Sequence, residues 1–152
     1  MANSDTKVTN PFTWLKEDHK AVDELFEKLS DTTENALKTR EELFTKLNDS
    51  LTRHAELEEA VLYPALEEIR KTHDITMEAF EEHHVAKLLL SELSNLDVDT
   101  EEWTAKLKVL QENIEHHVDE EESDMFKKAQ SALTEEQQEA LAKDMEAFLV
   151  NY

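Results

Sequence analysis

Apolar residues recur at steps of three and four positions along most of the chain, which predicts a series of amphipathic helices. One stripe of this kind carries Leu47, Leu51, Val61 and Ala65. The period is that of one helix face, so each stripe marks a surface that faces a common core. Five helices follow from the pattern, over about 11–30, 34–71, 75–95, 100–130 and from Thr134 to the C-terminus.

Local signals mark several helix ends. Asn10 followed by Pro11 is typical of an N-cap with proline at the first helical position. Thr134 and Gln137 have the types and spacing of a capping box. Pro64 falls inside the second helix, and we expect it to kink that helix, because proline clashes with the carbonyl one turn earlier.

Four long helices with short connections predict an all-α fold, an antiparallel up-down-up-down four-helix bundle with an additional C-terminal helix. We expect residues 1–9 to be a disordered N-terminus. The bundle is expected over residues 10–131. Residues 132–152 are then a C-terminal helix packed on the bundle, or a surface that pairs with another chain.

Six polar residues interrupt the apolar stripes of the bundle helices. They are His19, His54, Glu58, His83, His117 and Glu121. His54 and Glu58 are four residues apart, which places an imidazole and a carboxylate one turn apart on the same helix face. His117 and Glu121 repeat this spacing 63 residues later, and His83 follows His19 by 64. This internal repeat indicates two helical hairpins of one pattern.

These side chains predict a metal site. Burying four imidazoles and two carboxylates without partners would cost on the order of several kcal/mol for each unpaired charge. The donor set suits a pair of first-row transition ions, with imidazole favouring iron, zinc or copper and carboxylates able to bridge. Such a count leaves coordination positions open for a small ligand. A ferritin-type site fits poorly, because Glu-x-x-His occurs only at Glu81–His84.

Composition narrows the function classes. Sixteen Lys and Arg against 37 Asp and Glu give a formal charge of −21, so nucleic acid and anionic membrane surfaces are not expected partners. The absence of Cys excludes disulfides and thiol catalysis, and the absence of Gly excludes phosphate-binding glycine loops. The sequence has no apolar run of membrane length and no signal-peptide core, so we expect a cytoplasmic protein. We also expect it to be monomeric or weakly homo-oligomeric.

Four motifs in order cover about residues 12–130. They are Glu17-Asp18-His19, His54-x-x-x-Glu58 followed by Leu62-Tyr63-Pro64-Ala65-Leu66, Glu81-Glu82-His83, and His117-x-x-x-Glu121 followed by Met125-Phe126. In this respect the chain resembles the hemerythrin-like, His-His-Glu cation-binding domain family.

The resemblance implies a non-haem di-iron centre, with two iron ions joined by an oxo or hydroxo bridge. It also implies binding of, or reaction with, dioxygen, peroxide or nitric oxide in redox chemistry, sensing or stress response. Oxidoreductase activity on peroxide or nitric oxide falls within that range. The implied ligands are His19 and His54 on one iron, His83 and His117 on the other, and Glu58 and Glu121 as bridges.

The sequence departs from the oxygen-carrying members of the family. Those proteins have two histidines one turn apart on the third helix, whereas the positions one turn from His83 are Ala79 and Lys87. They also end with His and an Asp five residues later, whereas Glu121 follows His117 by four. Both differences favour redox chemistry or sensing over reversible oxygen carriage.

Other polar residues near these motifs have less specific interpretations. His84 and His116 point about 100° away from the stripes and are expected to be partly exposed or outside the first layer of ligands. Tyr63 is expected either to hydrogen-bond near the metal or to cap the end of the bundle, and we favour the cap. Glu56, Glu59, Asp119, Glu120 and Glu122 are expected to be surface charges, with Glu59 or Glu120 a candidate ligand at an open position.

The alternative function is a structural or interaction bundle whose His and Glu cluster holds zinc or no metal.

Overall fold

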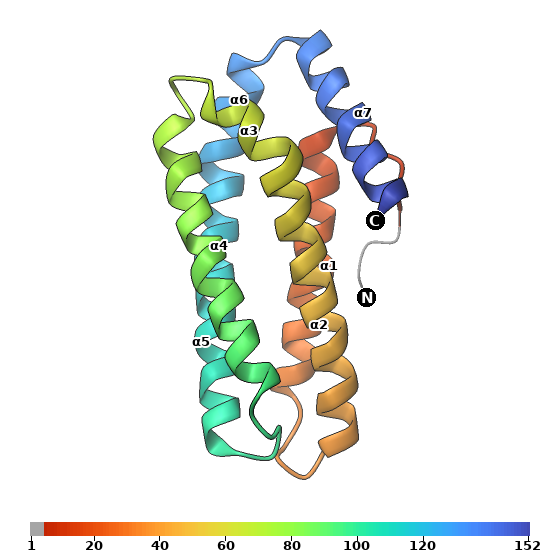
Figure 1. Ribbon diagram of the computed structural model, residues 1–152, viewed down its shortest axis with the longest axis vertical. Helices are drawn as coiled ribbons and strands as arrows, with labels where there is room; N and C mark the ends of the chain where they lie inside the picture. Colours follow the sequence, from red (N-terminus) through yellow and green to blue (C-terminus); the bar gives the residue numbers. More distant parts are fainter. Residues whose placement is uncertain (1–4) are drawn as a thin grey trace.

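The computed structural model describes residues 5–152, and these form an elongated bundle of helices (Figure 1). The two hairpins are α1 with α2 and α4 with α5, and α3 and α6 extend them at the upper end of Figure 1. The helical elements are α1 (Pro11–Ser30), α2 (Leu37–Leu57), η1 (Glu58–Leu62), α3 (Tyr63–Glu67), α4 (His73–Ser94), α5 (Glu101–Glu120), η2 (Glu121–Met125), α6 (Phe126–Ala132) and α7 (Glu135–Asn151). Residues 5–152 contain no strand. The predicted all-α bundle with an additional C-terminal helix is confirmed.

The predicted caps at Asn10 and Thr134 are present. Asn10 Oδ1 accepts hydrogen bonds from the backbone N–H groups of Phe12 and Thr13 at 2.9 and 3.1 Å. Thr134 and Gln137 form the reciprocal capping box. The second helix begins at Leu37, three residues later than predicted, and no side chain caps it.

Each hairpin contains a π-helical turn that starts at the glutamate of its His-x-x-x-Glu motif. In η1 the N–H of Tyr63 donates to the carbonyl of Glu58, and in η2 the N–H of Phe126 donates to the carbonyl of Glu121. Pro64 follows η1, but no proline lies near η2, so proline alone does not explain these turns. The irregularity predicted at Pro64 is therefore a π turn that the second hairpin shares. Such turns occur frequently at functional sites.

The polar residues of the motifs form a layer between two apolar clusters. The upper cluster joins α7 to the start of α1 and to α3 and α6, and it contains Phe12, Leu62, Met125 and Met145. The lower cluster fills the four-helix part of the bundle. Its buried members are Val22, Leu25, Phe26, Leu29, Phe44, Leu47, Leu51, Ala86, Leu90, Leu93, Trp103, Leu107 and Leu110.

The C-terminal helix α7 packs against α1, α2 and η1 beside the upper cluster. The segment 5–9 lies beside it: Val8 is buried, and its N–H donates to Glu146 Oε1 at 2.6 Å. Trp14 Nε1 donates to the carbonyl of Asp5 at 2.8 Å. The rest of the segment predicted to be disordered, residues 1–4, lies outside the described residues.

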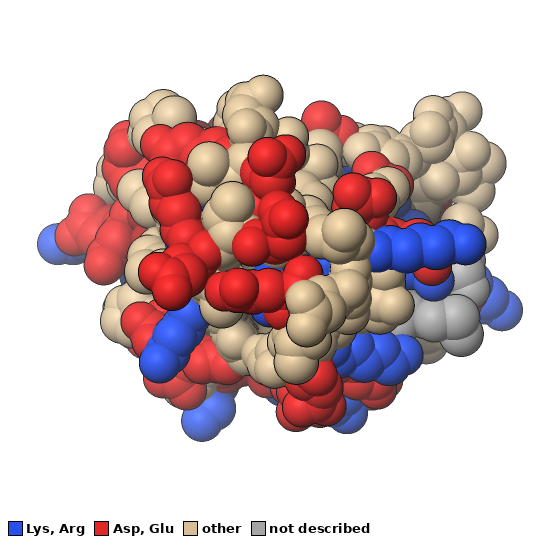
Figure 2. Space-filling model, turned by 90° about the horizontal axis from the view of Figure 1, so that it is seen from below, with Lys and Arg blue, Asp and Glu red and all other residues tan. Residues whose placement is uncertain are grey.

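The lower end of the bundle is acidic. Figure 2 shows Asp and Glu side chains gathered over this end, where the two hairpin connections lie. Exposed carboxylates on or beside these connections include Asp31, Glu34, Asp97, Asp99 and Glu101. Among the described helices, none is both long and apolar enough to span a membrane.

Candidate metal centre

The six predicted ligands come together in the polar layer. Each bundle helix contributes one histidine, and each π turn begins with one glutamate. No member of the group is more than 6% exposed. We call His19, His54, Glu58, His83, His117 and Glu121 the inner cluster.

Glu58 lies between the two hairpins. Its Oε1 is 3.2 Å from Nε2 of His54 on its own helix and 3.2 Å from Nε2 of His83 on α4. The same oxygen is 3.9 Å from Nε2 of His117. One carboxylate therefore reaches histidines of both hairpins, as a bridging ligand must.

Glu121 occupies the equivalent place in the second hairpin. Its Oε1 is 3.3 Å from Nε2 of His117 and 3.2 Å from Nε2 of His19 on α1. The Nε2 atoms of His19 and His54 are 3.2 Å apart. The inner cluster thus contains two histidine pairs with a carboxylate from each hairpin reaching toward both.

A second layer of carboxylates fixes the orientation of every inner histidine. Asp18 Oδ2 accepts from His54 Nδ1 at 2.7 Å and Glu82 Oε1 from His117 Nδ1 at 2.7 Å, each within its own hairpin. Between hairpins, Glu122 Oε2 accepts from His19 Nδ1 at 2.6 Å and Glu59 Oε2 from His83 Nδ1 at 3.0 Å. A carboxylate only accepts, so each Nδ1 carries a proton, and each imidazole in its neutral form presents the Nε2 lone pair to the centre. We call Asp18, Glu59, Glu82 and Glu122 the outer carboxylates.

Two of the outer carboxylates correct the sequence interpretation. Glu122 is expected to be a surface charge, and Glu59 a surface charge or a ligand at an open position, but each instead holds a histidine of the opposite hairpin through Nδ1. Asp18 and Glu82 had no predicted role. A signal for all four is present in the sequence, because an acidic residue directly precedes His19 and His83 and directly follows Glu58 and Glu121.

Tyr63 also corrects the sequence interpretation, because it enters the centre instead of capping the bundle end. Its hydroxyl donates to Glu121 Oε2 at 2.6 Å and lies 3.2 Å from Glu58 Oε1. The same oxygen is 3.2 Å from Nε2 of His83 and 3.3 Å from Nε2 of His117. In a regular α-helix, residues five apart lie about 140° apart around the axis. The π turn adds a residue and so brings Tyr63 onto the face of Glu58.

The balance of donors and acceptors fits a bound cation. Four Nε2 lone pairs and the oxygens of two carboxylates converge, and Tyr63 is the hydrogen-bond donor that the described residues place among them. Glu58 Oε2 and Glu121 Oε1 are buried and accept no hydrogen bond from residues 5–152. Buried acceptors without donors are costly, and metal ions would satisfy them together.

The electrostatics agree with this interpretation. Burial lowers the pKa of His54, but Glu58 and Asp18 outweigh it and raise that pKa well above the ordinary value of 6.5. Burial likewise lowers the pKa of His117, and Glu121, Glu58 and Glu82 together raise it well above 6.5. Burial raises the pKa of Glu58, but the adjacent histidines bring it well below 4.5. The centre therefore favours positive charge, which protons or metal ions can supply.

His84 and His116, the sequence neighbours of two inner histidines, lie outside the inner cluster. His84 is exposed, as is His116, whose Nε2 lies 3.2 Å from Glu120 Oε1 at the surface. His116 is also 3.8 Å from the Glu82 oxygen that His117 does not use. The expectation that both histidines are at least partly exposed is confirmed.

A model of the hemerythrin HHE cation-binding domain matches residues 10–129. The chain belongs to this family. A crystal structure of a hemerythrin HHE cation-binding domain-containing protein from Mycobacterium kansasii has the same fold, with a TM-score of 0.81 at 28% identity. That match covers 95% of this chain and 87% of the other.

A second relative of this hemerythrin-like domain is a larger protein from Nostoc sp. named DNA nickase. The two are 31% identical over 133 residues, which is 88% of this chain. The chain spans only 37% of the length of that relative. Membership of the family supports metal binding at two buried clusters that share Glu58. One consists of His19, His54, Glu58 and Glu121, and the other of Glu58, His83 and His117.

Replacing Asp18 by Asn tests the role of the outer carboxylates. The amide is a weaker acceptor for His54 Nδ1 and lacks the charge that makes His54 basic, so metal affinity is expected to fall about 10–100-fold. Asp23→Asn on the same helix is the control, because Asp23 is also an aspartate of α1 but is exposed. Competition with a chromogenic chelator measures both. Equal affinities in the two variants would contradict the role given to Asp18.

Proposed function

We propose that the inner cluster binds two iron ions and that the loaded centre reduces a peroxide. His19 and His54 would hold one ion, His83 and His117 the other, and Glu58 and Glu121 would bridge them. The convergence of six inward acceptors around one hydroxyl donor is the observation that carries this proposal. Two ferrous ions held there would supply the two electrons that cleave a peroxide O–O bond.

The donor set favours iron over zinc. Structural zinc sites are four-coordinate and mostly use Cys and His, whereas this centre offers four imidazoles, two carboxylates and a phenol. Carboxylate and phenolate oxygens are hard donors, and imidazole is an accepted ligand of iron. The donors thus exceed what one closed zinc site uses.

Tyr63 supplies the side chain that distinguishes this centre from an oxygen carrier. Its hydroxyl lies between His83 and His117, so it is a candidate ligand of the second ion in place of an additional histidine. Burial first, and then Glu121 and Glu58, raise the pKa of Tyr63 well above 10.0 when no metal competes for the oxygen. In the loaded centre Tyr63 would be either a ligand or, where it keeps its proton, a proton donor beside the reacting atoms. An oxidisable phenol suits turnover of peroxide better than reversible carriage of dioxygen.

The protein's own residues orient and shield the centre. The outer carboxylates hold each histidine ring in one tautomer and one direction. Phe126 stacks on His19 with its ring centroid 6.1 Å away, and Phe80 packs against Tyr63 at 5.1 Å. These rings exclude water from the upper side of the centre, which strengthens the electrostatic interactions inside it.

The surface charge of this domain does not suit the activity named for the Nostoc relative. With a net charge of −21 and an acidic lower end (Figure 2), the surface would repel a phosphate backbone. We therefore propose that DNA is not a partner of this domain.

The function is tested by mixing anaerobic, ferrous protein with hydrogen peroxide, dioxygen or nitric oxide and following iron oxidation. We expect hydrogen peroxide to oxidise the centre fastest, with one peroxide consumed for each pair of ferrous ions and water as the product. Faster reaction with dioxygen, or stable binding of nitric oxide without peroxide turnover, would overturn the proposed substrate.

Tyr63→Phe tests the place of the phenol. If Tyr63 is a ligand, the ferric wild-type protein shows phenolate-to-iron visible absorption that the variant lacks, while both proteins keep two irons. Peroxide turnover is expected to fall by about 10²–10⁴-fold, the usual contribution of a positioned proton donor. Tyr152→Phe removes an exposed phenol and is the control. Unchanged absorption and turnover in Tyr63→Phe would assign the hydroxyl a packing role only.

A further inference from the structure

A cavity of about 310 Å³ opens directly beneath the metal centre. All four inner histidines line its inner end. Its walls are apolar and come from all four bundle helices, so the centre meets an apolar chamber rather than packed core. The wall residues are Val22, Leu51, Ala86, Leu90, Ile114 and Val118.

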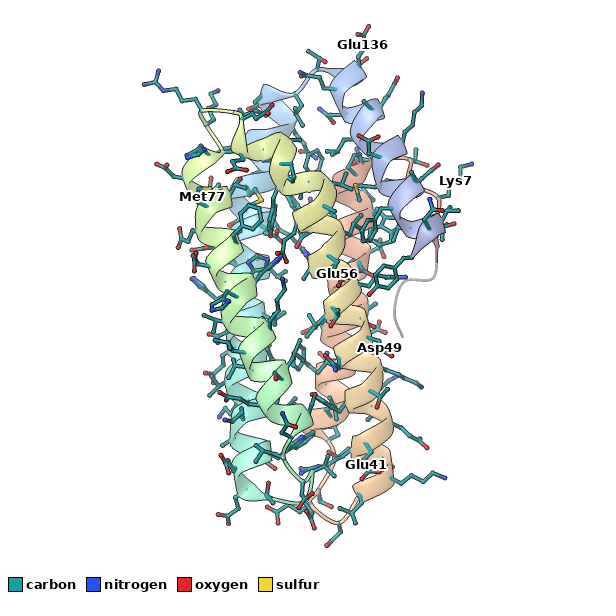
Figure 3. The ribbon with its side chains drawn as sticks, in the orientation of Figure 1. Lys7, Glu41, Asp49, Glu56, Met77 and Glu136 are labelled. Carbon is teal, nitrogen blue, oxygen red and sulfur yellow. The ribbon has the colours of Figure 1, made fainter. Side chains whose placement is uncertain are left out.

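The exposed residues among those that line the cavity, Glu56 on α2 and Lys87 on α4, indicate that its mouth lies between these two helices. Thr52, Ala55 and Glu56 line it from α2, and Lys87 lines it from α4. Glu56, labelled in Figure 3, lies about halfway along the bundle, at the level of the centre. Since Phe126 and Phe80 close the upper side, the cavity gives an approach to the histidines from below.

The cavity is too large for hydrogen peroxide or dioxygen alone. A water molecule takes about 30 Å³ in the liquid, and an apolar cavity of about 150 Å³ binds benzene. The volume of this cavity is about twice that of the benzene-binding cavity. It lies at the lower end of the volumes found for pockets that bind organic ligands. A two-atom ligand at the centre would leave most of the apolar wall without a partner.

The charges at the mouth favour a neutral ligand. Lys87 is already paired with Glu59, with Nζ 2.9 Å from Oε2 and 3.0 Å from Oε1. Glu59 in turn holds His83, so recruiting Lys87 to a ligand carboxylate would disturb the centre. Glu56 at the mouth would repel an anion, and the wall residues offer no charged partner.

We propose that the cavity binds the apolar body of a neutral organic hydroperoxide of about the size of cumene hydroperoxide, with its –OOH group at the inner histidines. This rests on the proposed function and specifies its substrate class. Reduction breaks the O–O bond and yields an alcohol and water. The two electrons come from the two ferrous ions of the proposed centre, and the two protons come from solvent.

The first test measures binding without turnover. Cumyl alcohol, the unreactive product of cumene hydroperoxide, is titrated into the metal-loaded protein by isothermal calorimetry. Wild-type protein is expected to bind it, and Ala86→Leu, which fills the chamber, is expected to weaken binding by about tenfold or more. Ala105→Leu adds the same atoms to an exposed position of α5 outside the cavity and should leave binding unchanged. Absence of binding to wild type, or equal binding to both variants, would overturn the proposal.

Leu90→Phe narrows the cavity from another wall and guards against a folding defect in Ala86→Leu, with thermal unfolding and iron content measured for each. In either variant the ratio of the oxidation rate with cumene hydroperoxide to that with hydrogen peroxide should fall about tenfold or more. An unchanged ratio overturns the substrate class even if both peroxides react. If cumyl alcohol binds as expected but neither peroxide oxidises the iron, the proposed function fails and the cavity remains an organic-ligand site.

Discussion

Glu58→Gln is expected to lose both metal ions, because Glu58 belongs to both buried His and Glu clusters and is the ligand that we propose they share. The amide keeps the size of the side chain but removes the charge and half of the acceptor capacity. Removing one partner from a buried charged cluster costs about 3–5 kcal/mol. For a chain of this length the melting temperature should fall by roughly 10 °C.

Glu41→Gln is the matched control for this variant. Glu41 is on α2, the helix that continues into η1, at the lower end in Figure 3, and is exposed. Its replacement should change the free energy of unfolding by no more than about 0.5 kcal/mol. Metal content and thermal unfolding are measured for both variants. A Glu58→Gln protein that retains two ions per chain would show that the cluster does not depend on this bridge.

Removing the metal is expected to reverse the pH dependence of stability near neutrality. In the metal-free protein, the protonated forms of His54 and His117 stabilise the fold, because the pKa values of both are raised on folding. This contribution is complete below pH 6.5, and it is lost as the pH rises through the pKa values of the folded state. The ionised form of Glu58 stabilises the fold above pH 4.5, because the pKa of Glu58 is lowered on folding. This contribution is lost as the pH falls through the pKa of the folded state. The metal-free protein should therefore be most stable between pH 4.5 and pH 6.5.

Metal binding requires the histidines to lose the protons they hold at Nε2, so it strengthens as pH rises. The increase in melting temperature produced by metal should be larger at about pH 8 than at about pH 5.5. Circular dichroism with and without a chelator measures this increment at each pH. An increment that is equal at both values, or larger in acid, would contradict ligation by these histidines.

The bundle and the convergence of the inner cluster follow from the sequence because both depend on periodicity. His54 and Glu58 share a helix face in any regular helix, and the 63- and 64-residue offsets place their counterparts on the opposite hairpin. The structure places these six side chains within contact of one another, as that reasoning requires. Their role as ligands remains a prediction.

Predictions from the α-helical period were wrong where the backbone forms a π turn. The α-helical period puts Tyr63 about 140° from Glu58, and only the π turn brings its hydroxyl into the centre. Pro64 signalled an irregularity in the first hairpin, but η2 has no comparable signal. The outer carboxylates were missed for another reason. Asp18 and Glu59 reach histidines on other helices, and the periodicity of one helix does not predict such contacts, so the acidic residue beside each motif residue was the available signal.

Metal analysis of the untagged protein tests the central claim most directly. The protein is loaded anaerobically with excess ferrous ion, freed of unbound metal and assayed for iron and zinc per chain. We expect two iron ions per chain and no stoichiometric zinc, in agreement with two histidine pairs and two carboxylates that reach both. One ion or fewer per chain, or zinc that ferrous ion does not displace, would contradict a di-iron centre.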